Sequence, residues 1–474
     1  MKIVFAASEC APFAKSGGLG DVAQALPKAL AKEKGVEVSV FVPYYSKIKY
    51  NNDIATEFVT SFYIKLGWRD CYCGIFKLKS RSKKLRYYFI DNEYYFNRDS
   101  LYGHFDDGER FAFFSKAVIE ASCALGIDPV IYHCNDWQTA LVPVILKSEP
   151  ERFSSVRTVF TIHNIEYQGI AAPDFAQEVL GLPERFNPVL DMNGTTNFMK
   201  GAIVTCDKIT TVSETYAEEI LNPYFAHNLD GILNENRYKL CGIVNGIDTD
   251  VFNPATDPAI PVNYSAETIE NKAECKRRLQ EELGLDQRPE VPVVAMITRL
   301  ASHKGLELVE CVMREILETD LQLVIVGTGE GRFEGMFRTL AYIYPHKVSA
   351  NICFSTTLAS RVYAGCDFLL MPSKSEPCGL SQLIAMRYGA LPIVRETGGL
   401  KDTVPPVNPM DRTGRGFTFK SYNAYDMLDA IRRAVAFYYD DKAGFEAIRS
   451  ADMQFDSSWG RSVEKYLALY SSII

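Results

Sequence analysis

Short apolar runs rich in β-branched and aromatic residues alternate with helical patterns along the whole chain, and this alternation limits the fold more than any other feature. In the first half the runs cover residues 2–7, 36–42, 86–91, 130–133, 158–163 and 208–212. After residue 240 they cover 242–245, 292–298, 321–327, 368–372 and 392–395. Many are apolar almost throughout, as expected of parallel strands buried on both faces. The pattern predicts α/β doubly wound sheets, and the two sets of strands predict two of them.

With 474 residues the chain is too long for one ordinary core. The turn-rich stretch Val244-Asn245-Gly246-Ile247-Asp248 marks the boundary that we predict. The first domain then covers 1–244 and the second 245–455. In the last segment, 456–474, apolar residues recur at helical spacing, which predicts an amphipathic helix with a buried face.

Charge and composition narrow the possible partners. The net charge of -8, from 51 basic and 59 acidic residues, argues against nucleic-acid binding. No run approaches the length of a membrane span, and the apolar stretch before Ser8 is too short for a signal peptide. The twelve cysteines are scattered without any C-x-x-C motif, as expected of reduced thiols. We therefore expect a soluble intracellular protein that binds neither nucleic acid nor membrane.

Polar residues follow several strands of the first half, where ligands of open α/β sheets bind. Lys15-Ser16-Gly17-Gly18-Leu19-Gly20-Asp21 offers backbone N–H groups, a helix start and a cation to a phosphate, although a simple tight turn is an equally good interpretation. Asp136 is either a carboxylate that faces a ligand or an N-cap. His163, taken alone, is better explained as a packed residue.

The second half repeats this arrangement. Arg299 and Lys304 follow a strand and suit a clamp on a diphosphate, against the alternative of a solvated surface pair. Glu376, before Pro377-Cys378-Gly379, is placed to hydrogen-bond sugar or ribose hydroxyls, and Thr397-Gly398-Gly399 offers a second phosphate cradle. Together the two halves predict a cleft between two domains, suited to a diphosphate joined to a sugar.

Competing motifs fail on particular residues. Gly327-Thr328-Gly329-Glu330-Gly331 is followed by Arg332 where a dinucleotide fingerprint needs glycine. No Gly-Lys dipeptide exists, which excludes a standard Walker A loop. Asp248-Thr249-Asp250 has the D-x-D form, but it lies in the predicted linker and we assign it no metal.

The Lys15–Leu19 segment resembles the K-x-G-G-L hallmark of bacterial glycogen synthases and plant starch synthases. The pair His163-Asn164 and the segments Glu376-Pro377-Cys378-Gly379-Leu380 and Thr397-Gly398-Gly399-Leu400 match the same family. The resemblance implies the GT-B fold: two Rossmann-like doubly wound parallel-sheet domains facing across a deep cleft, with a C-terminal helix that returns to the first domain. It implies transfer of glucose from ADP-glucose to the 4-hydroxyl at the non-reducing end of an α-1,4-glucan, glycogen or a maltooligosaccharide, with retention. It also implies that no metal or other cofactor is needed, and a bacterial cytoplasmic or mature plastid protein.

The resemblance implies a role for each matching position. Lys15 and the Gly17-Gly18 backbone hold the donor phosphates, while Arg299 and Lys304 neutralise the leaving diphosphate. Glu376 binds donor hydroxyls, and His163 places the sugar and offers its backbone carbonyl near the reacting carbon. The remaining positions line the glucose and acceptor region or complete the donor loops: Asp21, Asp136, Asn245 and Tyr95 in the first group, and Cys378, Gly379, Leu380, Thr397, Gly398 and Gly399 in the second.

Two positions depart from the family pattern. Phe354 stands where a tyrosine is expected beside the adenine, and Ile384 stands where the wider E-x7-E pattern has a second glutamate. With no carboxylate pair, a front-face mechanism is favoured, in which the leaving phosphate helps to deprotonate the acceptor. The alternatives are a related GT-B enzyme that uses UDP-glucose or another acceptor, a catalytically silent glucan-binding protein and, more distantly, a dinucleotide-dependent oxidoreductase.

Overall fold

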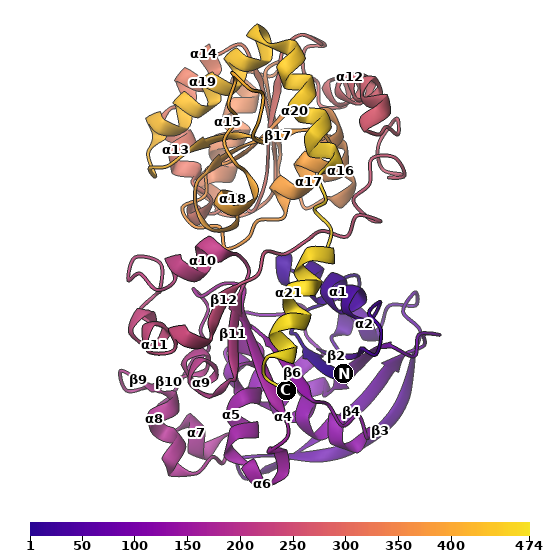
Figure 1. Cartoon of the computed structure of the whole chain (residues 1–474), viewed down its shortest axis with the longest axis vertical. Helices are drawn as coiled ribbons and strands as arrows, with labels where there is room; N and C mark the ends of the chain where they lie inside the picture. The colour runs from indigo at the N-terminus through magenta and orange to yellow at the C-terminus, as the bar shows by residue number, and fades with distance from the viewer. The chain divides into compact units, whose positions relative to one another are not determined.

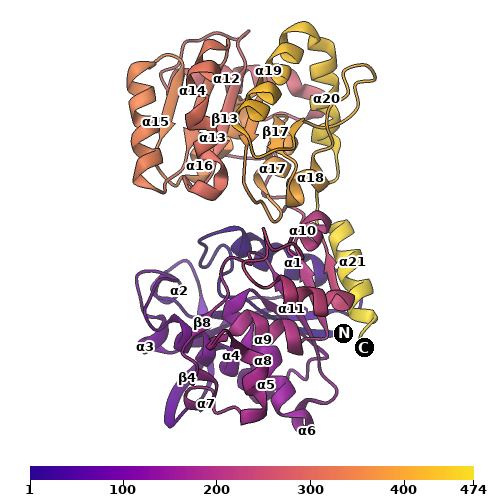
Figure 2. The same cartoon turned by 90° about the vertical axis from the view of Figure 1, so that its left-hand side faces the viewer.

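The computed structural model describes the whole chain, Met1–Ile474, and divides it into two compact units (Figures 1 and 2). Unit 1 comprises Met1–Asn245 together with Trp459–Ile474, and unit 2 comprises Gly246–Ser458. None of the helices is both long and apolar enough to cross a membrane. All twelve cysteines are free.

Unit 1 is built on a nine-stranded sheet with the order β12-β11-β7-β6-β1-β2-β5-β4-β3. Its strands are β1 (Lys2–Ala6), β2 (Glu37–Pro43), β3 (Thr56–Leu66), β4 (Arg69–Leu78), β5 (Leu85–Asp91), β6 (Ile131–Asn135), β7 (Arg157–Ile162), β11 (Lys208–Thr211) and β12 (Leu240–Gly242). The seven strands from β12 to β5 are parallel, as the apolar runs predict.

The hairpin β3–β4 extends this sheet in the antiparallel sense, which the sequence analysis did not anticipate. Residues of β3 are largely exposed along its first half, and Phe58 and Val59 lie among them. An edge hairpin that faces solvent carries no continuous apolar run, so a search for buried parallel strands misses it. The sheet of unit 1 is therefore mixed, with a parallel core.

Helices and a small second sheet surround the large sheet of unit 1 (Figure 2). The helices are α1 (Gly18–Leu30), α2 (Ser46–Lys49), α3 (Glu93–Phe96), α4 (Asp107–Ala124), α5 (Leu141–Ser148), α6 (Pro150–Phe153), α7 (Phe175–Glu178), α8 (Asn187–Leu190), α9 (Phe198–Thr205), α10 (Glu214–Glu219), α11 (Asp230–Glu235) and α21 (Gly460–Ser471). The small antiparallel sheet consists of β8 (Ile170–Ala171), β9 (Asp191–Met192) and β10 (Thr195–Asn197).

Unit 2 contains a fully parallel six-stranded sheet with the order β15-β14-β13-β16-β17-β18. The strands are β13 (Val293–Ile297), β14 (Gln322–Val326), β15 (Val348–Asn351), β16 (Phe368–Met371), β17 (Leu391–Arg395) and β18 (Phe417–Phe419). Numbered within the unit, this is the 3-2-1-4-5-6 order of a Rossmann sheet. The outermost strands, β15 and β18, are three or four residues long and were not predicted.

The helices of unit 2 cover this sheet, and its strands contribute to two separate buried clusters. The helices of unit 2 are α12 (Lys272–Glu282), α13 (Leu306–Cys311), α14 (Met313–Glu318), α15 (Gly331–Ile343), α16 (Thr356–Gly365), α17 (Ser381–Arg387), α18 (Gly398–Thr403), α19 (Ala424–Asp440) and α20 (Lys442–Gln454).

The last helix, α21, packs on unit 1 although it follows unit 2 in the chain (Figure 1). Tyr470 is fully buried and its hydroxyl lies 2.7 Å from Nδ1 of His133 in β6. The Ser462 hydroxyl donates to the carbonyl of Val244 at 2.6 Å. These contacts join the end of the chain to the first unit.

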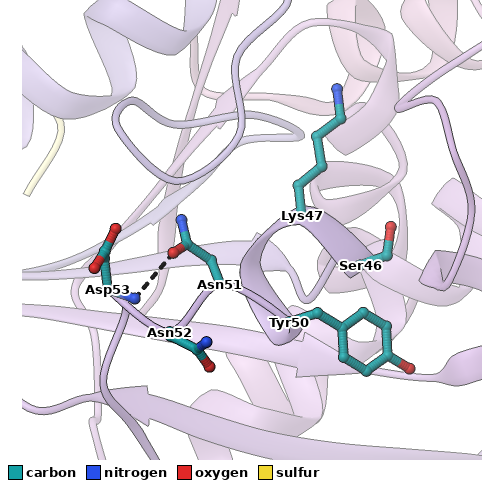
Figure 3. A pocket seen from close by; sticks show the side chains of 6 residues that line it. All are labelled: Ser46, Lys47, Tyr50, Asn51, Asn52 and Asp53. Carbon is teal, nitrogen blue, oxygen red and sulfur yellow. Dashed lines mark hydrogen bonds between the residues drawn. The ribbon is translucent and has the colours of Figure 1, made fainter.

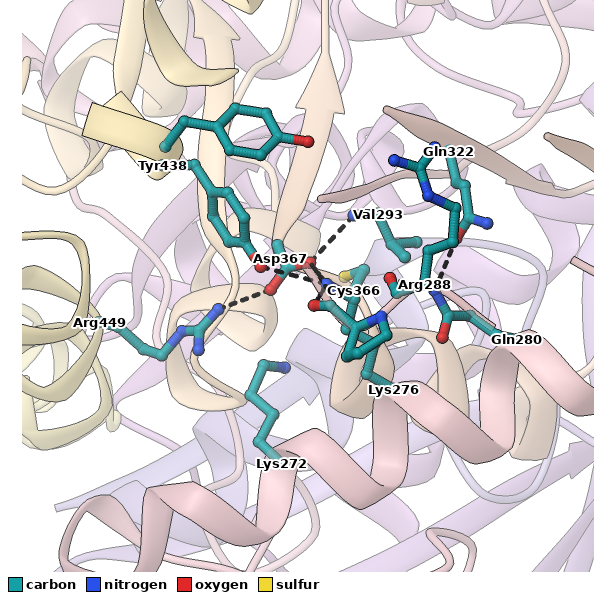
Figure 4. Close-up of polar contacts among 12 residues, drawn as sticks. Lys272, Lys276, Gln280, Arg288, Val293, Gln322, Cys366, Asp367, Tyr438 and Arg449 are labelled. Carbon is teal, nitrogen blue, oxygen red and sulfur yellow. Dashed lines mark hydrogen bonds and ion pairs between the residues drawn. The ribbon is translucent and has the colours of Figure 1, made fainter. Parts of the chain in front are cut away.

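A buried ionic cluster lies at the amino end of β16 (Figure 4). Asp367, just before that strand, accepts from Lys276 at 2.7 Å and from Arg449 at 2.8 Å, and its Oδ2 also accepts from the backbone N–H of Val293 at 2.9 Å. Lys272 from the same helix as Lys276 donates to three backbone carbonyls. The cluster ties α12 and α20 to the sheet of unit 2.

Candidate active site

Each large sheet contains a point at which its strand order reverses, and the candidate site residues gather there. In unit 1 the reversal lies between β1 and β6, and in unit 2 between β13 and β16. Ligands of doubly wound sheets bind outside the carboxyl ends of the strands at this point. Lys15–Asp21 follow β1, Asp136 follows β6, Arg299 and Lys304 follow β13, and Glu376–Leu380 follow β16. The other predicted residues follow other strands: His163 follows β7, Asn245 follows β12, Phe354 follows β15 and Thr397–Gly399 follow β17, while Tyr95 lies in α3 after β5.

The loop after β1 brings a cation and a helix start together. Gly17 is the N-cap of α1 and Gly18 is its first residue, so N–H groups at this end have no partner within the helix. Nζ of Lys15 lies 2.7 Å from the carboxylate of Asp21, and both side chains are partly exposed. Burial raises the pKa of Asp21 although Lys15 opposes the shift. The loop can therefore present a positive charge and backbone donors to an anion.

The loop after β6 holds Asp136 in a conformation that is unusual for a residue with a side chain. Its φ and ψ are 56° and 179°, a region that normally needs glycine, at a cost of roughly 1–3 kcal/mol. The carboxylate does not cap its own helix. Instead Oδ1 accepts the backbone N–H of His163 at 2.7 Å and of Asn164 at 3.3 Å. Asp136 stands at the N-cap position, but its side chain makes no capping hydrogen bond, and its carboxylate is not freely exposed either.

The pKa of Asp136 is unusually high for an aspartate. Burial raises its pKa to about 7, although the N–H groups of His163 and Asn164 favour the charged form. A carboxyl group with this pKa can both accept and donate hydrogen bonds near neutral pH. It suits the recognition of sugar hydroxyls.

His163 is neutral at ordinary pH because burial lowers its pKa to about 3. Its Nε2 lies 2.9 Å from Oδ1 of Asn135, whose amide orientation is fixed by a 3.0 Å bond from Nδ2 to the carbonyl of Ala6. Nε2 must therefore carry the proton, which leaves Nδ1 as an acceptor. The side chain is a fixed hydrogen-bonding group and not a cation.

Two further predicted residues of unit 1 differ in their surroundings. Asn245 is 4% exposed, and its Oδ1 is buried without a hydrogen-bond partner, which is unusual for a buried acceptor. Tyr95 lies in α3 and is buried, with its hydroxyl 2.5 Å from Glu109, which pairs with Arg69. The structure thus leaves Asn245 with unused acceptor capacity but engages the Tyr95 hydroxyl in the interior of the unit.

In unit 2 the loops after β13 and β16 meet at an ion pair. Nζ of Lys304 lies 2.7 Å from Oε2 of Glu376, and the hydroxyl of Ser373 donates to the same oxygen at 2.8 Å. Burial disfavours the charged form of Glu376, but Lys304 and Ser373 outweigh it and the pKa of Glu376 lies below its usual range. No protein group donates to Oε1, which keeps its acceptor capacity.

Backbone contacts hold these two loops in place. The backbone N–H of Lys374 donates to the carbonyl of His303 at 2.9 Å. Gly305 has φ of 73°, and a Cβ there would stand 2.1 Å from the carbonyl oxygen of Pro372. Only glycine allows this approach, so the position of Lys304 relative to Glu376 is built into the backbone.

Arg299 and Phe354 are the exposed members of the predicted set in unit 2. The Arg299 side chain forms no ion pair, in contrast to that of Lys304. Phe354 follows β15 and is 78% exposed. A free guanidinium and an uncovered aromatic ring at strand ends are suited to binding a phosphate and a planar base.

The loop after β17 packs directly on the Glu376 loop. The N–H of Gly399 lies 3.1 Å from the carbonyls of Glu376 and Pro377. A Cβ at Gly398 or Gly399 would lie 2.0 or 2.1 Å from the carbonyls of Glu376 and Cys378, respectively. The other predicted residues of these loops are Cys378 and Thr397, which are buried, Gly379 at a φ of 71°, and Leu380, the N-cap of α17. The structure brings all of them together around Glu376.

Sequence reasoning missed the residues that support this arrangement. Ser373 binds Glu376, Arg395 donates to the carbonyl of Ser373 at 2.9 Å, and Asn135 orients His163. In unit 1, the carboxylate of Glu9 accepts the N–H groups of Ser16 and Gly17. Polar residues just after or just before strand ends are the sequence feature that these four share.

A hollow of about 600 Å³ lies away from these loops, at α2 (Figure 3). It contains none of the predicted site residues and is lined by Ser46, Lys47, Tyr50, Asn51, Asn52 and Asp53. No three His, Cys, Asp or Glu side chains gather into a group that could hold a metal ion. The concentration of polar groups at the strand reversals, and not cavity size, identifies the candidate site.

Comparison with known families agrees with both units. The family described as "Starch synthase catalytic domain" matches residues 2–235, and "Glycosyl transferases group 1" matches residues 279–438. The catalytic domain of starch synthase IV from Arabidopsis thaliana, bound to ADP and acarbose, superposes with a TM-score of 0.92 at 34% identity over 99% of this chain and 98% of that one. Sucrose-phosphate synthase from Thermosynechococcus elongatus shares the fold, with a TM-score of 0.62 at 18% identity over 100% and 98% of the two chains.

Full-length bacterial relatives are also similar to this chain. The glycogen synthase of Clostridium acetobutylicum is 47% identical over 480 residues, which cover all of both chains. That of Anoxybacillus flavithermus is 47% identical over 479 residues, 100% of this chain and 98% of its own. The two Rossmann-like units confirm the predicted GT-B fold. The chain belongs to the glycogen and starch synthase family of glycosyltransferases.

Proposed function

We propose that the protein transfers glucose from ADP-glucose to the 4-hydroxyl at the non-reducing end of an α-1,4-glucan, with retention of the anomeric configuration and without a metal. The observation that supports this most is the Glu376 carboxylate, which is ionised, fixed through Oε2, and open to a ligand through Oε1. The related starch synthase IV binds ADP and acarbose, which is consistent with a nucleotide diphosphate and a glucan-like ligand here.

In unit 2, Arg299 and Lys304 neutralise the diphosphate, and Glu376 orients the donor. Lys304 is balanced by Glu376 in the free protein, whereas Arg299 has no carboxylate partner. Preorganised cations stabilise charge that grows on the leaving group in the transition state. Oε1 of Glu376 accepts hydrogen bonds from donor hydroxyls, which fixes the orientation of the sugar.

In unit 1, Lys15 and the start of α1 contribute further phosphate contacts. Asp136 and Asn245 hydrogen-bond sugar hydroxyls, the first with a pKa of about 7 and the second with a buried unpaired oxygen. His163, neutral and fixed by Asn135, places the transferred glucose and offers its backbone carbonyl near the reacting carbon.

The proposed step breaks one bond and forms one bond on the same face of the sugar. The bond between the anomeric carbon and the diphosphate oxygen breaks, and its electron pair stays on ADP. The acceptor 4-oxygen bonds to that carbon as an oxocarbenium-like state collapses. The acceptor proton passes to the departing phosphate oxygen, so no protein base is required.

Metal independence is part of the proposal because Arg299, Lys304 and N–H groups neutralise the charge of the diphosphate, as a magnesium ion does in other enzymes. Dialysis against a strong chelator should leave the rate nearly unchanged. A loss of activity that magnesium restores would instead assign the metal to a carboxylate pair such as Asp248 and Asp250.

The decisive assay uses radiolabelled donor, glycogen and the purified protein. We expect incorporation from ADP-glucose to exceed that from UDP-glucose by a wide margin, and an α-amylase digest to release the label. Preference for UDP-glucose would identify a different donor, and no incorporation from either would favour a silent glucan-binding protein.

A further inference from the structure

We propose that Glu9 is a positioning residue that fixes the glycine loop, so that Lys15 and the N–H of Gly18 are directed at the donor phosphates. This inference rests on the proposed function. Glu9 lies in the segment that leaves β1 and is only 4% exposed.

The contacts of Glu9 are made with the backbone of the loop. One carboxylate oxygen, Oε2, accepts the N–H of Ser16 in a short hydrogen bond and the N–H of Gly17 at 3.3 Å. These are the two residues before Gly18, the first residue of α1. Glu9 thus satisfies two donors at the start of the helix from the inner side, and the donor of the next residue is left for a ligand.

The segment that carries Glu9 is itself fixed. The carbonyl of Ser8 accepts the hydroxyl of Tyr45 at 2.8 Å, and the Ser8 hydroxyl lies 2.7 Å from that of Tyr102. Cys10 and Ala14 exchange two backbone hydrogen bonds at 2.8 and 2.9 Å. Because these contacts hold the backbone on either side of Glu9, its carboxylate imposes one conformation on residues 15–18.

The negative charge of Glu9 strengthens these bonds, because a carboxylate accepts N–H groups more strongly than a neutral side chain does. Burial raises the pKa of Glu9, the N–H groups of Ser16 and Gly17 oppose the shift, and the negative charge of Asp21 adds to it. Protonation of Glu9 therefore weakens its hold on the loop. Asp21 pairs with Lys15 and accepts neither of the N–H groups that Glu9 binds, so it does not replace Glu9.

Glu9→Gln in the full chain tests the proposal, since glutamine keeps the shape and one acceptor oxygen but loses the charge. We expect kcat/KM for ADP-glucose to fall about 10-fold, the loss typical of one weakened charged hydrogen bond. The Kd of ADP, measured by titration calorimetry, should rise, while KM for glycogen and the melting temperature stay at parental values. Glu235→Gln, an exposed carboxylate in α11, is the matched control and should change none of these.

Glu9→Asp provides a second variant that retains the charge but is one methylene too short, and it should also lower kcat/KM. Parental kcat/KM and ADP affinity in Glu9→Gln would overturn the proposal. So would a lower melting temperature with equal losses for donor and glucan, because that pattern indicates a purely structural role. The ADP titration needs no turnover. If the unmodified protein transferred no glucose from ADP-glucose, the proposed function would be refuted, but the ADP affinities of the unmodified protein and of Glu9→Gln could still be compared.

Discussion

Two buried carboxylates at opposite ends of one strand, β16, differ in what they leave unused. Asp367 precedes the strand and Glu376 follows it, and each pairs with lysine at 2.7 Å. Both oxygens of Asp367 are occupied, Oδ1 by Arg449 and Oδ2 by Lys276 and Val293. Glu376 receives both of its donors on Oε2 alone.

This difference shows that a buried ion pair does not identify a functional site by itself. The Asp367 cluster lies at the amino edge of the sheet, and both carboxylate oxygens of Asp367 are satisfied, as a structural element should be. Glu376 lies at the carboxyl edge, next to the strand reversal, and its Oε1 accepts no hydrogen bond from the protein. Location and unused hydrogen-bonding capacity separate the two, whereas burial and pairing do not.

The largest expected effect concerns Glu376. We expect Glu376→Ala to fold and to lose activity by about 10³-fold or more, because the donor is no longer oriented and its hydroxyls lose a charged acceptor. Glu376→Gln should be strongly impaired as well. Steady-state kinetics with ADP-glucose measure the effect, and circular dichroism and melting curves must match the parent. A well-folded Glu376→Ala enzyme with parental kcat/KM would show that Glu376, like Asp367, has no role in the reaction.

Asp367→Asn should do the opposite, with a loss of stability and little change in activity per folded molecule. Leaving Lys276 without a carboxylate partner, and Arg449 with Glu446 alone, should reduce the free energy of unfolding by about 3–5 kcal/mol. Glu446→Gln, which removes a partly exposed partner of Arg449 and Lys442, is the matched control and should cost less than about 1 kcal/mol. A drop in turnover without a drop in melting temperature would contradict the structural assignment.

The same cluster predicts a pH dependence of stability. Burial opposes ionisation of Asp367, but Lys276 and Arg449 outweigh it and lower the pKa to about 2, below the unfolded value of about 3.9. A depressed folded-state pKa adds stability above the unfolded value, and this stability is lost as pH falls from about 4 toward 2. The difference in melting temperature between the parent and Asp367→Asn should therefore narrow over that range.

The cations of the site should produce the next largest effects. Arg299→Ala and Lys304→Ala should each lower kcat by ~10²–10³-fold, since each acts on charge that develops on the leaving diphosphate. Arg299 forms no ion pair, so its removal leaves no carboxylate unpaired and gives the cleaner test. Binding of glycogen should be unchanged in both variants. Unchanged turnover would show that the altered cation does not stabilise the leaving diphosphate.

Much of the fold could be predicted because its strands are buried on both faces. The apolar runs at 2–7 and 321–327 identify buried parallel strands, which need no partner information to be recognised. The hairpin β3–β4 and the edge strands β15 and β18 were missed, since an exposed or short strand is defined by its neighbours and not by its own apolarity.

The site was predictable at the level of which loops carry it, because polar residues after strand ends converge in any doubly wound sheet. What sequence could not supply was the partner of each side chain. Asp136 contacts the backbone of His163 and not its own helix, and Tyr95 turns inward to Glu109. Such choices depend on distances between segments that are far apart in the chain.

The smallest expected effect concerns Phe354, the one exposed uncharged member of the set in unit 2. If its ring stacks on the adenine of the donor, Phe354→Tyr should be nearly neutral, whereas Phe354→Ala should raise KM for ADP-glucose. Loss of a stacking contact is worth roughly 1 kcal/mol, or about 5-fold in KM. Tyr342→Ala, at another exposed aromatic of unit 2 that lies in α15, is the matched control and should leave KM unchanged. Because Phe354 is already 78% exposed, its truncation removes little buried surface and should leave the melting temperature unaltered. Equal changes in KM for ADP-glucose and for glycogen would show that the ring does not recognise the nucleotide, and would restrict the recognition of the donor to the charged groups around Glu376.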